Sequence, residues 1–166
     1  SGGQAATGGV LEALGMLTLD GMTFDEKSTI KLNAGTTLTS NAAFTVKTVE
    51  MGEHWLVLGS DSTDLTIADN LTVIGGIDSG YADLTLNGPV DVQGSGIGSR
   101  GGTVTFGTGA GETSFAEGTG MRLDNTTFEL KTSLNVSWLD LQGVSSALKT
   151  NGNILNINEG IEIGGG

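Results

Sequence analysis

Five aspartates near the middle of the chain have a residue type and spacing suited to chemistry: Asp61, Asp64, Asp69, Asp78 and Asp83. The first three form one group and the last two follow about one repeat later, so stacked repeats would place these carboxylates along one face. Two carboxyl groups about 5 to 9.5 Å apart can hydrolyse a glycosidic bond. Calcium takes about six to eight oxygen ligands, including carboxylates. The five aspartates therefore predict weak calcium binding and, as an alternative function, cleavage of a polysaccharide.

Other motifs give less support to an enzyme. His54 is the only histidine and the chain has no cysteine, so a nucleophile paired with a general base is not evident. The segment from Gly96 to Gly101 matches the pattern G-x-G-x-x-G, but a dinucleotide motif must open a helix. The residues that follow it alternate as in a strand. We expect no catalytic residue and no cofactor other than calcium.

Short strands are the elements that would position these side chains. Short units recur along almost the whole chain, with apolar residues at alternate positions and Thr often between them. Leu65 to Ile67 and Leu84 to Leu86 are examples. Gly, Asn, Asp and Ser bound the units. This alternation predicts strands and not helices.

The units repeat at a nearly even spacing, roughly 20 residues from one to the next, which lies in the range of known repeat folds. One series takes the first apolar residue of each unit: Phe44, Leu65, Leu84, Val104, Met121, Leu139 and Ile161. In repeat folds each unit buries its apolar face against its neighbours. The sequence predicts an all-β fold, a parallel β-solenoid of about eight coils. The alternative is a β-sandwich or jelly roll.

Composition agrees with this fold and excludes several classes of protein. The 29 glycines suit the many corners of a solenoid, and the single proline, Pro89, stands directly before a predicted strand. Without cysteine there is no disulfide scaffold. The formal net charge of −12 would repel phosphate backbones, so we expect no nucleic-acid partner. No apolar run is long enough to cross a membrane.

A single solenoid domain is expected over residues 17–166, preceded by a Gly-rich N-terminal segment or cap over residues 1–16. Val10, Leu11, Leu14 and Leu17 have helical spacing, which predicts a short helix or an irregular cap over residues 10–17. The stretch from Gly94 to Gly120 is the richest in glycine and is expected to be a loop or a thin-walled part of the rod.

Two runs carry a resemblance to a known family, one from Ser28 to Thr39 and one from Leu65 to Val73. Their Gly-, Asn- and Thr-rich texture resembles that of bacterial autotransporter passenger domains and filamentous-haemagglutinin-like adhesins. The resemblance covers most of the chain and implies an acidic, Cys-poor β-solenoid exported to the cell surface. The chain lacks the family's secretion elements, so we expect an excised section or a relative secreted by another route.

These observations lead to an expected function. The strand pattern continues from Leu155 to Ile163 with no cap after it, and an open solenoid edge recruits other strands. We expect a structural and adhesive rod, extracellular or on a bacterial cell surface, that associates with itself or with neighbouring repeats. Trp55, Trp138 and Tyr81 offer aromatic surfaces for a glycan or a host-surface partner.

Overall fold

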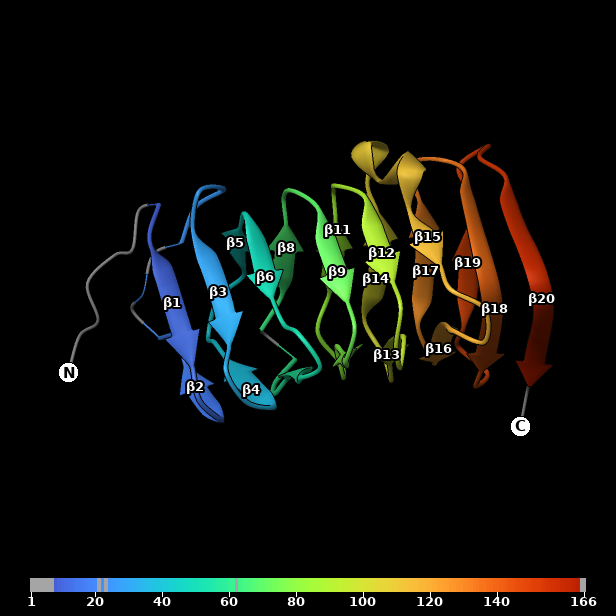
Figure 1. Ribbon diagram of the computed structural model, residues 1–166. Helices are drawn as coiled ribbons and strands as arrows, with labels where there is room; N and C mark the ends of the chain where they lie inside the picture. The colour runs from blue at the N-terminus through green and yellow to red at the C-terminus, as the bar shows by residue number, and fades with distance from the viewer. Residues whose placement is uncertain (1–7, 21, 23, 62, 165–166) are drawn as a thin grey trace.

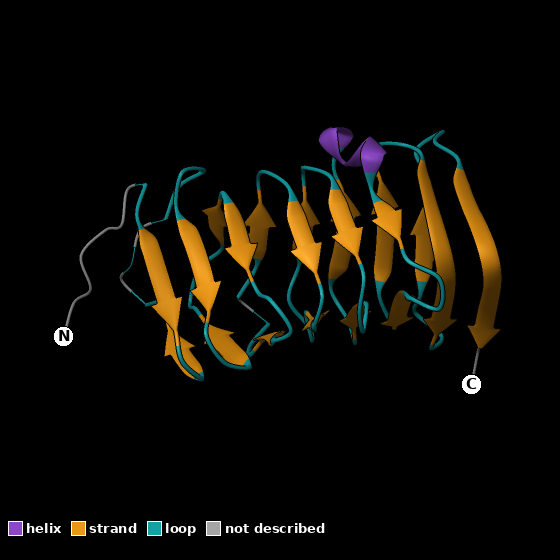
Figure 2. Cartoon of the chain, viewed as in Figure 1, coloured by secondary structure: helices purple, strands orange, loops and turns teal. Residues whose placement is uncertain are grey.

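The computed structural model describes residues 8–20, 22, 24–61 and 63–164. They form a parallel β-solenoid, in which strands of successive coils pair in parallel. Figure 1 shows the coils stacked along one axis, with β1 and β20 at opposite ends of the rod. Figure 2 shows that nearly all of the regular structure is strand. The predicted solenoid of about eight coils is confirmed, and the sandwich alternative is wrong.

The strands lie on three faces. Face 1 holds two three-stranded sheets: β1 (Val10–Ala13), β3 (Thr29–Leu32) and β6 (Thr48–Glu50), then β9 (Leu71–Val73), β12 (Val90–Val92) and β15 (Ser114–Phe115). Face 2 is an eight-stranded sheet: β2 (Met16–Thr18), β4 (Thr36–Thr39), β7 (Trp55–Leu58), β10 (Gly76–Asp78), β13 (Ile97–Ser99), β16 (Gly120–Asp124), β18 (Leu134–Gln142) and β20 (Leu155–Gly164). Face 3 is a six-stranded sheet: β5 (Phe44–Val46), β8 (Leu65–Ile67), β11 (Leu84–Leu86), β14 (Thr103–Phe106), β17 (Thr127–Leu130) and β19 (Ala147–Lys149).

The core runs along the inside of the three faces. In β8, Leu65 and Ile67 are buried while Thr66 between them points outward, and β11 repeats the pattern. Because the register places like positions directly above one another, apolar side chains stack in rows from coil to coil. This stacking explains why such short strands are stable here.

The predicted repeat series is partly correct. Phe44, Leu65, Leu84 and Val104 follow one another in register on face 3. The next step is wrong, because Val104 pairs with Phe128 and not with Met121. Met121, Leu139 and Ile161 form a separate row on face 2: Met121 pairs with Leu139, which pairs with Ile161. The step from Val104 to Met121 therefore crossed from one face to another.

The predicted helix over residues 10–17 is also wrong. Val10–Ala13 forms β1, which pairs with β3, and Met16–Thr18 forms β2, which pairs with β4. Gly15 turns the chain between them at φ +94°, which no helix accommodates. Strand pairing with the next coil thus overrides the local helical spacing. Residues 1–7 of the expected N-terminal segment lie outside the described residues.

The Gly-rich stretch from Gly94 to Gly120 belongs to the solenoid wall. It contains β13, β14 and β15, together with the 3₁₀ helix η1 (Thr108–Glu112). The helix sits at the corner between face 3 and face 1 and lengthens that coil (Figure 2). Within the described part of the chain no helix is long and apolar enough to span a membrane.

The two Asn-Gly pairs serve their corners differently. Asn151 and Gly152 both adopt positive φ, 51° and 82°, as expected for a tight turn. Neither Asn87 nor Gly88 adopts positive φ. A Cβ on Gly88 would lie 2.4 Å from the carbonyl carbon of Asp69. Gly88 is therefore required for close approach of two coils.

Candidate functional site

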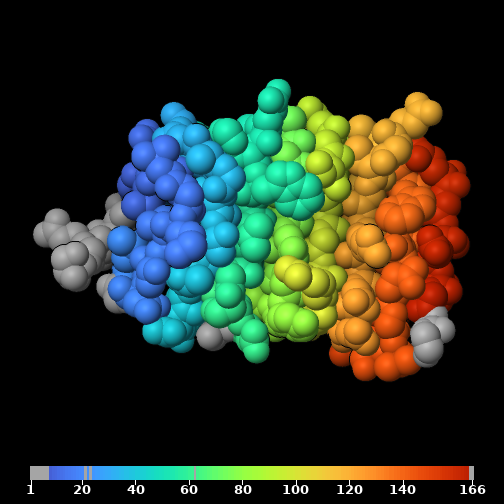
Figure 3. Space-filling view, turned by 90° about the horizontal axis from the view of Figure 1, so that it is seen from below, coloured from blue at the N-terminus to red at the C-terminus, as the bar shows by residue number. Residues whose placement is uncertain are grey.

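The outer surface of face 2 carries a groove of about 510 Å³ that spans strands β7 to β18. Its lining includes Trp55, Trp138, Arg100 and Arg122. These are the only two tryptophans and the only two arginines of the chain. Figure 3 views the molecule from below, the side on which face 2 lies in Figure 1. The groove thus gathers all of the tryptophans and arginines of the protein on one surface.

Glycines at outward positions form the floor of the groove. Gly76 pairs with Trp55, and Gly120 pairs with Trp138. Gly98 lies between Asp78 and Arg122 in register. A Cβ on Gly120 would lie 2.2 Å from the carbonyl oxygen of Trp138, so no larger residue fits there without moving the backbone. The larger side chains therefore stand above a floor of exposed backbone.

Two indole rings border the groove. Trp55 is 44 % exposed and lies over Gly76, where an added Cβ would be 2.7 Å from the ring atoms Cη2 and Cζ3. Trp138 is half-buried and leans on Gly160, where an added Cβ would be 3.3 Å from the ring atom Cδ1. Four strand steps separate the two tryptophans, which corresponds to about 19 Å at about 4.8 Å per step.

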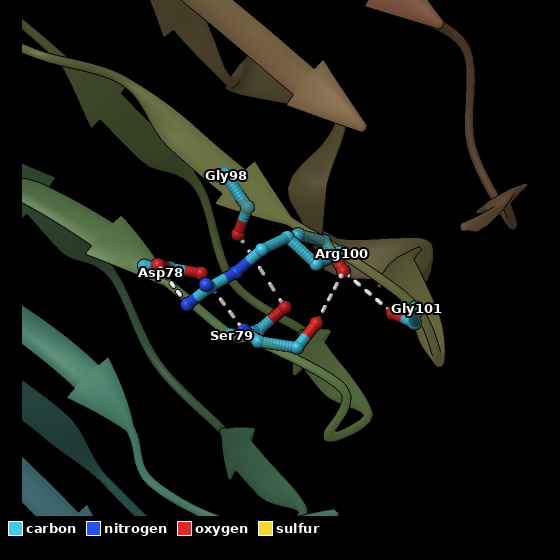
Figure 4. A network of polar contacts seen from close by, with 7 residues as sticks. Asp78, Ser79, Gly98, Arg100 and Gly101 are labelled. Atoms are coloured by element: carbon cyan, nitrogen blue, oxygen red, sulfur yellow. Dashed lines mark hydrogen bonds and ion pairs between the residues drawn. The ribbon is translucent and has the colours of Figure 1, made fainter. Parts of the chain in front are cut away.

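Ion pairs hold both arginines of the groove. Arg100 Nη2 lies 2.8 Å from Asp78 Oδ2, and the other oxygen of Asp78 accepts the backbone N–H of Gly80 (Figure 4). Arg122 Nε lies 3.5 Å from Oδ2 of Asp140, whose side chain is 7 % exposed. Because each carboxylate is anchored, each guanidinium keeps a defined position while remaining largely exposed.

A buried hydroxyl network lies behind Arg100. Ser99 Oγ donates to the carbonyl of Gly101 at 2.6 Å, and Thr126 Oγ1 donates to Ser99 Oγ at 3.0 Å. On the preceding coil, Ser79 Oγ donates to the carbonyl of Gly98 at 3.4 Å (Figure 4). Ser99 pairs with the buried Leu123 of the next coil. Ser99 therefore occupies an inward position that is apolar on that coil, and its hydroxyl forms hydrogen bonds there. The network fixes the backbone that carries Arg100.

A hydrogen bond to a residue two coils further on holds one loop at the edge of the groove. Gly118, which lines the groove, donates its backbone N–H to Glu159 Oε2 at 3.0 Å. Glu159 lies where the pairing of β18 with β20 shifts register, between Val136 and Trp138. Hydrogen bonds from the Ser137 hydroxyl and from the Gly118 N–H lower the pKa of Glu159.

Two of the five predicted aspartates stack as expected. Asp64 and Asp83 precede β8 and β11, whose residues pair in register. Asp64 Oδ1 accepts the backbone N–H of Asp83 at 2.8 Å, and Asp83 Oδ1 accepts the backbone N–H of Thr103 at 2.7 Å. Each carboxylate therefore ties its corner to the next coil, which is a structural role.

The other three aspartates are not brought together with that pair. Asp69 lies at the corner between face 3 and face 1, Asp61 is exposed between β7 and β8, and Asp78 belongs to the groove on face 2. No three acidic or histidine side chains of the described residues are placed to hold a metal ion. Calcium binding stays a prediction, tested by thermal unfolding with and without a chelator. An unchanged midpoint would remove it.

The remaining sequence motifs lie in structural positions. His54 forms part of the turn before β7, where its backbone N–H donates to the backbone carbonyl of Met51 at 3.0 Å. Its own carbonyl packs so closely against Gly75 that a Cβ there would be 2.0 Å away. The segment from Gly96 to Gly101 contains strand β13, and a further strand follows it. It is not a helix-opening phosphate loop.

Sequence reasoning identified only part of the groove. Trp55 and Trp138 were expected to offer stacking surfaces, but Tyr81 lies outside the groove lining. Arg100 and Arg122 were missed. The available signal was that each arginine directly follows an inward strand residue, Ser99 or Met121, so the two arginines occupy outward positions about one repeat apart.

Comparisons with known proteins give no relative. No family model, no curated protein and no solved structure matches the chain. Function is therefore inferred from the geometry of the molecule itself.

Proposed function

We propose that the chain is a structural and adhesive β-solenoid rod of a bacterial cell surface that lengthens end to end by strand addition to its last coil. The outer edge of β20 carries this proposal. β20 pairs with β18 along one side, and none of the described strands pairs with its other side. Such an edge presents free backbone N–H and C=O groups, which template the pairing of a further strand.

Apolar side chains at the last coil favour the same contact. Ile161 and Ile163 continue the inward rows of Leu139 and Leu141. Leu139 and Leu141 are buried, whereas Ile161 is 51 % and Ile163 is 73 % exposed. A further coil would bury them and stabilise the contact by up to about 1.5–3 kcal/mol for each side chain.

The first coil offers a complementary surface. Leu11 and Leu17 begin the inward rows that Ile30 and Leu38 continue, and both are only partly buried. β1 and β2 each pair on one side only among the described strands. The first and last coils are different surfaces, so contact between them is heterologous. A contact of this kind repeats from copy to copy and generates an open filament.

The solenoid fold supports the proposed relation to autotransporter passengers and filamentous-haemagglutinin-like adhesins, because a rod of this kind is what the resemblance implies. A location outside the cell or on its surface belongs to the same proposal. The enzyme alternative has less support. Asp64 and Asp83 both accept backbone N–H bonds, and Asp78 is paired with Arg100.

Sedimentation velocity tests the strand-addition proposal. We expect the wild-type chain to form species that grow with protein concentration and with salt, which screens the repulsion caused by the net charge of −12. The double variant Ile161→Lys/Ile163→Lys is expected to sediment as a single rod. Both side chains lie on the open coil, so the variant should keep the wild-type circular dichroism spectrum.

Ile74→Lys is the matched control. Ile74 is 40 % exposed and lies between β9 and β10, away from both ends. This variant should assemble as the wild type does. A wild-type chain that sediments as one monomer at every concentration and salt would overturn the proposal.

A further inference from the structure

We propose that the groove on face 2 binds a neutral glycan chain, with sugar rings stacked on Trp55 and Trp138. The inference rests on the adhesive part of the proposed function and is independent of strand addition to β20. A failed glycan-binding test would therefore leave the assembly experiment unaffected.

The aromatic surfaces favour a ligand with flat apolar faces. Trp55 and Trp138 stand about 19 Å apart across four strand steps, a distance that several linked sugar rings can span. The glycines between them, among them Gly98 and Gly120, leave the space over the floor open. A chain lying in the groove would contact an indole ring near each end.

The charged side chains favour hydrogen bonding to hydroxyl groups. Arg100 keeps its ion pair with Asp78, and Arg122 keeps its ion pair with Asp140, so the remaining N–H donors of both guanidinium groups are already positioned. Asp124 also lines the groove. A sugar hydroxyl both donates and accepts, so it can bond to either partner. Positioned partners lose little conformational entropy when the ligand binds.

The balance of charge selects a neutral ligand. Arg100 and Arg122 are outnumbered by Asp78, Asp124 and Asp140 around the groove, and the whole chain carries −12. A uronate polymer is negatively charged, so the excess negative charge around the groove would repel it. An uncharged glycan meets no such repulsion.

The backbone of face 2 argues against an extended peptide. From β7 to β18 every strand pairs on both sides, so its N–H and C=O groups are already used. A peptide strand needs a free sheet edge for pairing, and this groove lies on the outward surface of a sheet. Recognition must therefore come from side chains, as it does for a sugar.

Equilibrium titration followed by tryptophan fluorescence tests the proposal, with cellohexaose, chitohexaose and mannohexaose as the neutral probes and hexagalacturonate as the acidic probe. We expect at least one neutral hexasaccharide to bind and to change the fluorescence, and hexagalacturonate to bind more weakly. Trp55→Ala and Trp138→Ala should each lower the affinity by about tenfold or more, measured by isothermal titration calorimetry.

Two further variants control for loss of folding. Gly98→Leu would fill the groove from a position where an added Cβ meets its nearest atom at 3.6 Å, so it should abolish binding while the thermal midpoint is retained. Tyr81→Ala removes an exposed aromatic ring that does not line the groove and should leave the affinity unchanged. The proposal would be overturned by no binding of any neutral probe, by tighter binding of hexagalacturonate, or by binding that survives Gly98→Leu.

Discussion

Phe128 packs edge to face against Phe106, with ring centroids 5.8 Å apart and an interplanar angle of 74°. Both rings are fully buried. They meet because Val104 pairs with Phe128 across the coil that η1 lengthens. The additional residues of that coil therefore extend outward at a corner, while the core keeps its stacking from coil to coil.

This aromatic pair should contribute strongly to stability. Phe128→Ala is expected to lower the free energy of unfolding by about 3–5 kcal/mol, because it removes buried ring contacts and leaves a cavity. Urea unfolding followed by circular dichroism measures the change. Tyr81→Ala, at a ring that is 61 % exposed, should change the free energy by about 0.5 kcal/mol or less. Equal effects of the two substitutions would contradict the assigned packing.

Close approach of coils at Gly94 gives a second prediction. A Cβ there would lie 1.5 Å from the carbonyl oxygen of Ile74, whereas an added Cβ at Gly35 would meet no atom within 4 Å. Gly94→Ala should therefore destabilise the chain by at least about 1–3 kcal/mol. Gly35→Ala should be neutral or stabilise it by up to about 1 kcal/mol. Thermal unfolding of both variants compares them, and a neutral Gly94→Ala would show that the coils are further apart.

The hydroxyl network behind Arg100 gives a third prediction. Ser99→Ala should cost about 1–3 kcal/mol, because the buried Thr126 hydroxyl and the Gly101 carbonyl lose a partner. The double variant Ser99→Ala/Thr126→Ala should cost less than the sum of the single changes. Chemical denaturation of the wild type, the two single variants and the double variant measures the coupling energy between the two hydroxyls. Ser145→Ala, at an exposed serine, is the control, and strict additivity in the cycle would argue against the network.

The carboxylate of Glu159 gives a pH-dependent prediction. Hydrogen bonds from Ser137 and Gly118 lower its pKa in the folded state, so its ionised form stabilises the fold above the ordinary glutamate pKa of about 4.3. This contribution is lost as the pH falls through the lowered pKa. The wild type should therefore be more stable than Glu159→Gln at pH 6, and the difference should shrink toward pH 3. Urea midpoints across this range measure it, and a difference that grows on acidification would contradict the assignment.

Much of the fold was predictable because strand alternation and stacking are local and periodic. The row of Leu65, Leu84 and Val104 followed directly from the nearly even spacing of these residues, and it is confirmed. The row failed at the next coil because η1 adds residues at a corner, and corner residues carry no periodic signal. The short helix expected over residues 10–17 failed because pairing with β3 and β4 is a long-range contact.

The groove was harder to predict. Trp55 and Trp138 share an outward row only if the lengths of the four intervening coils are known, and these lengths are unequal. The coil that contains η1, for example, is longer than the coil before it. Because the coil lengths vary, an average repeat length does not predict that Trp55 and Trp138 lie in the same outward row. Asp64 and Asp83 were correctly placed on neighbouring coils, but their backbone hydrogen bonds depend on corner geometry that the residue types alone do not specify.

Electron microscopy of the purified chain across a concentration series tests whether the solenoid assembles end to end. We expect filaments of uniform width that lengthen with concentration, in which the first coil of one copy covers the last coil of the next. The double variant Ile161→Lys/Ile163→Lys should show separate rods. Separate short rods of the wild-type chain at every concentration would contradict the claim that β20 recruits a further coil.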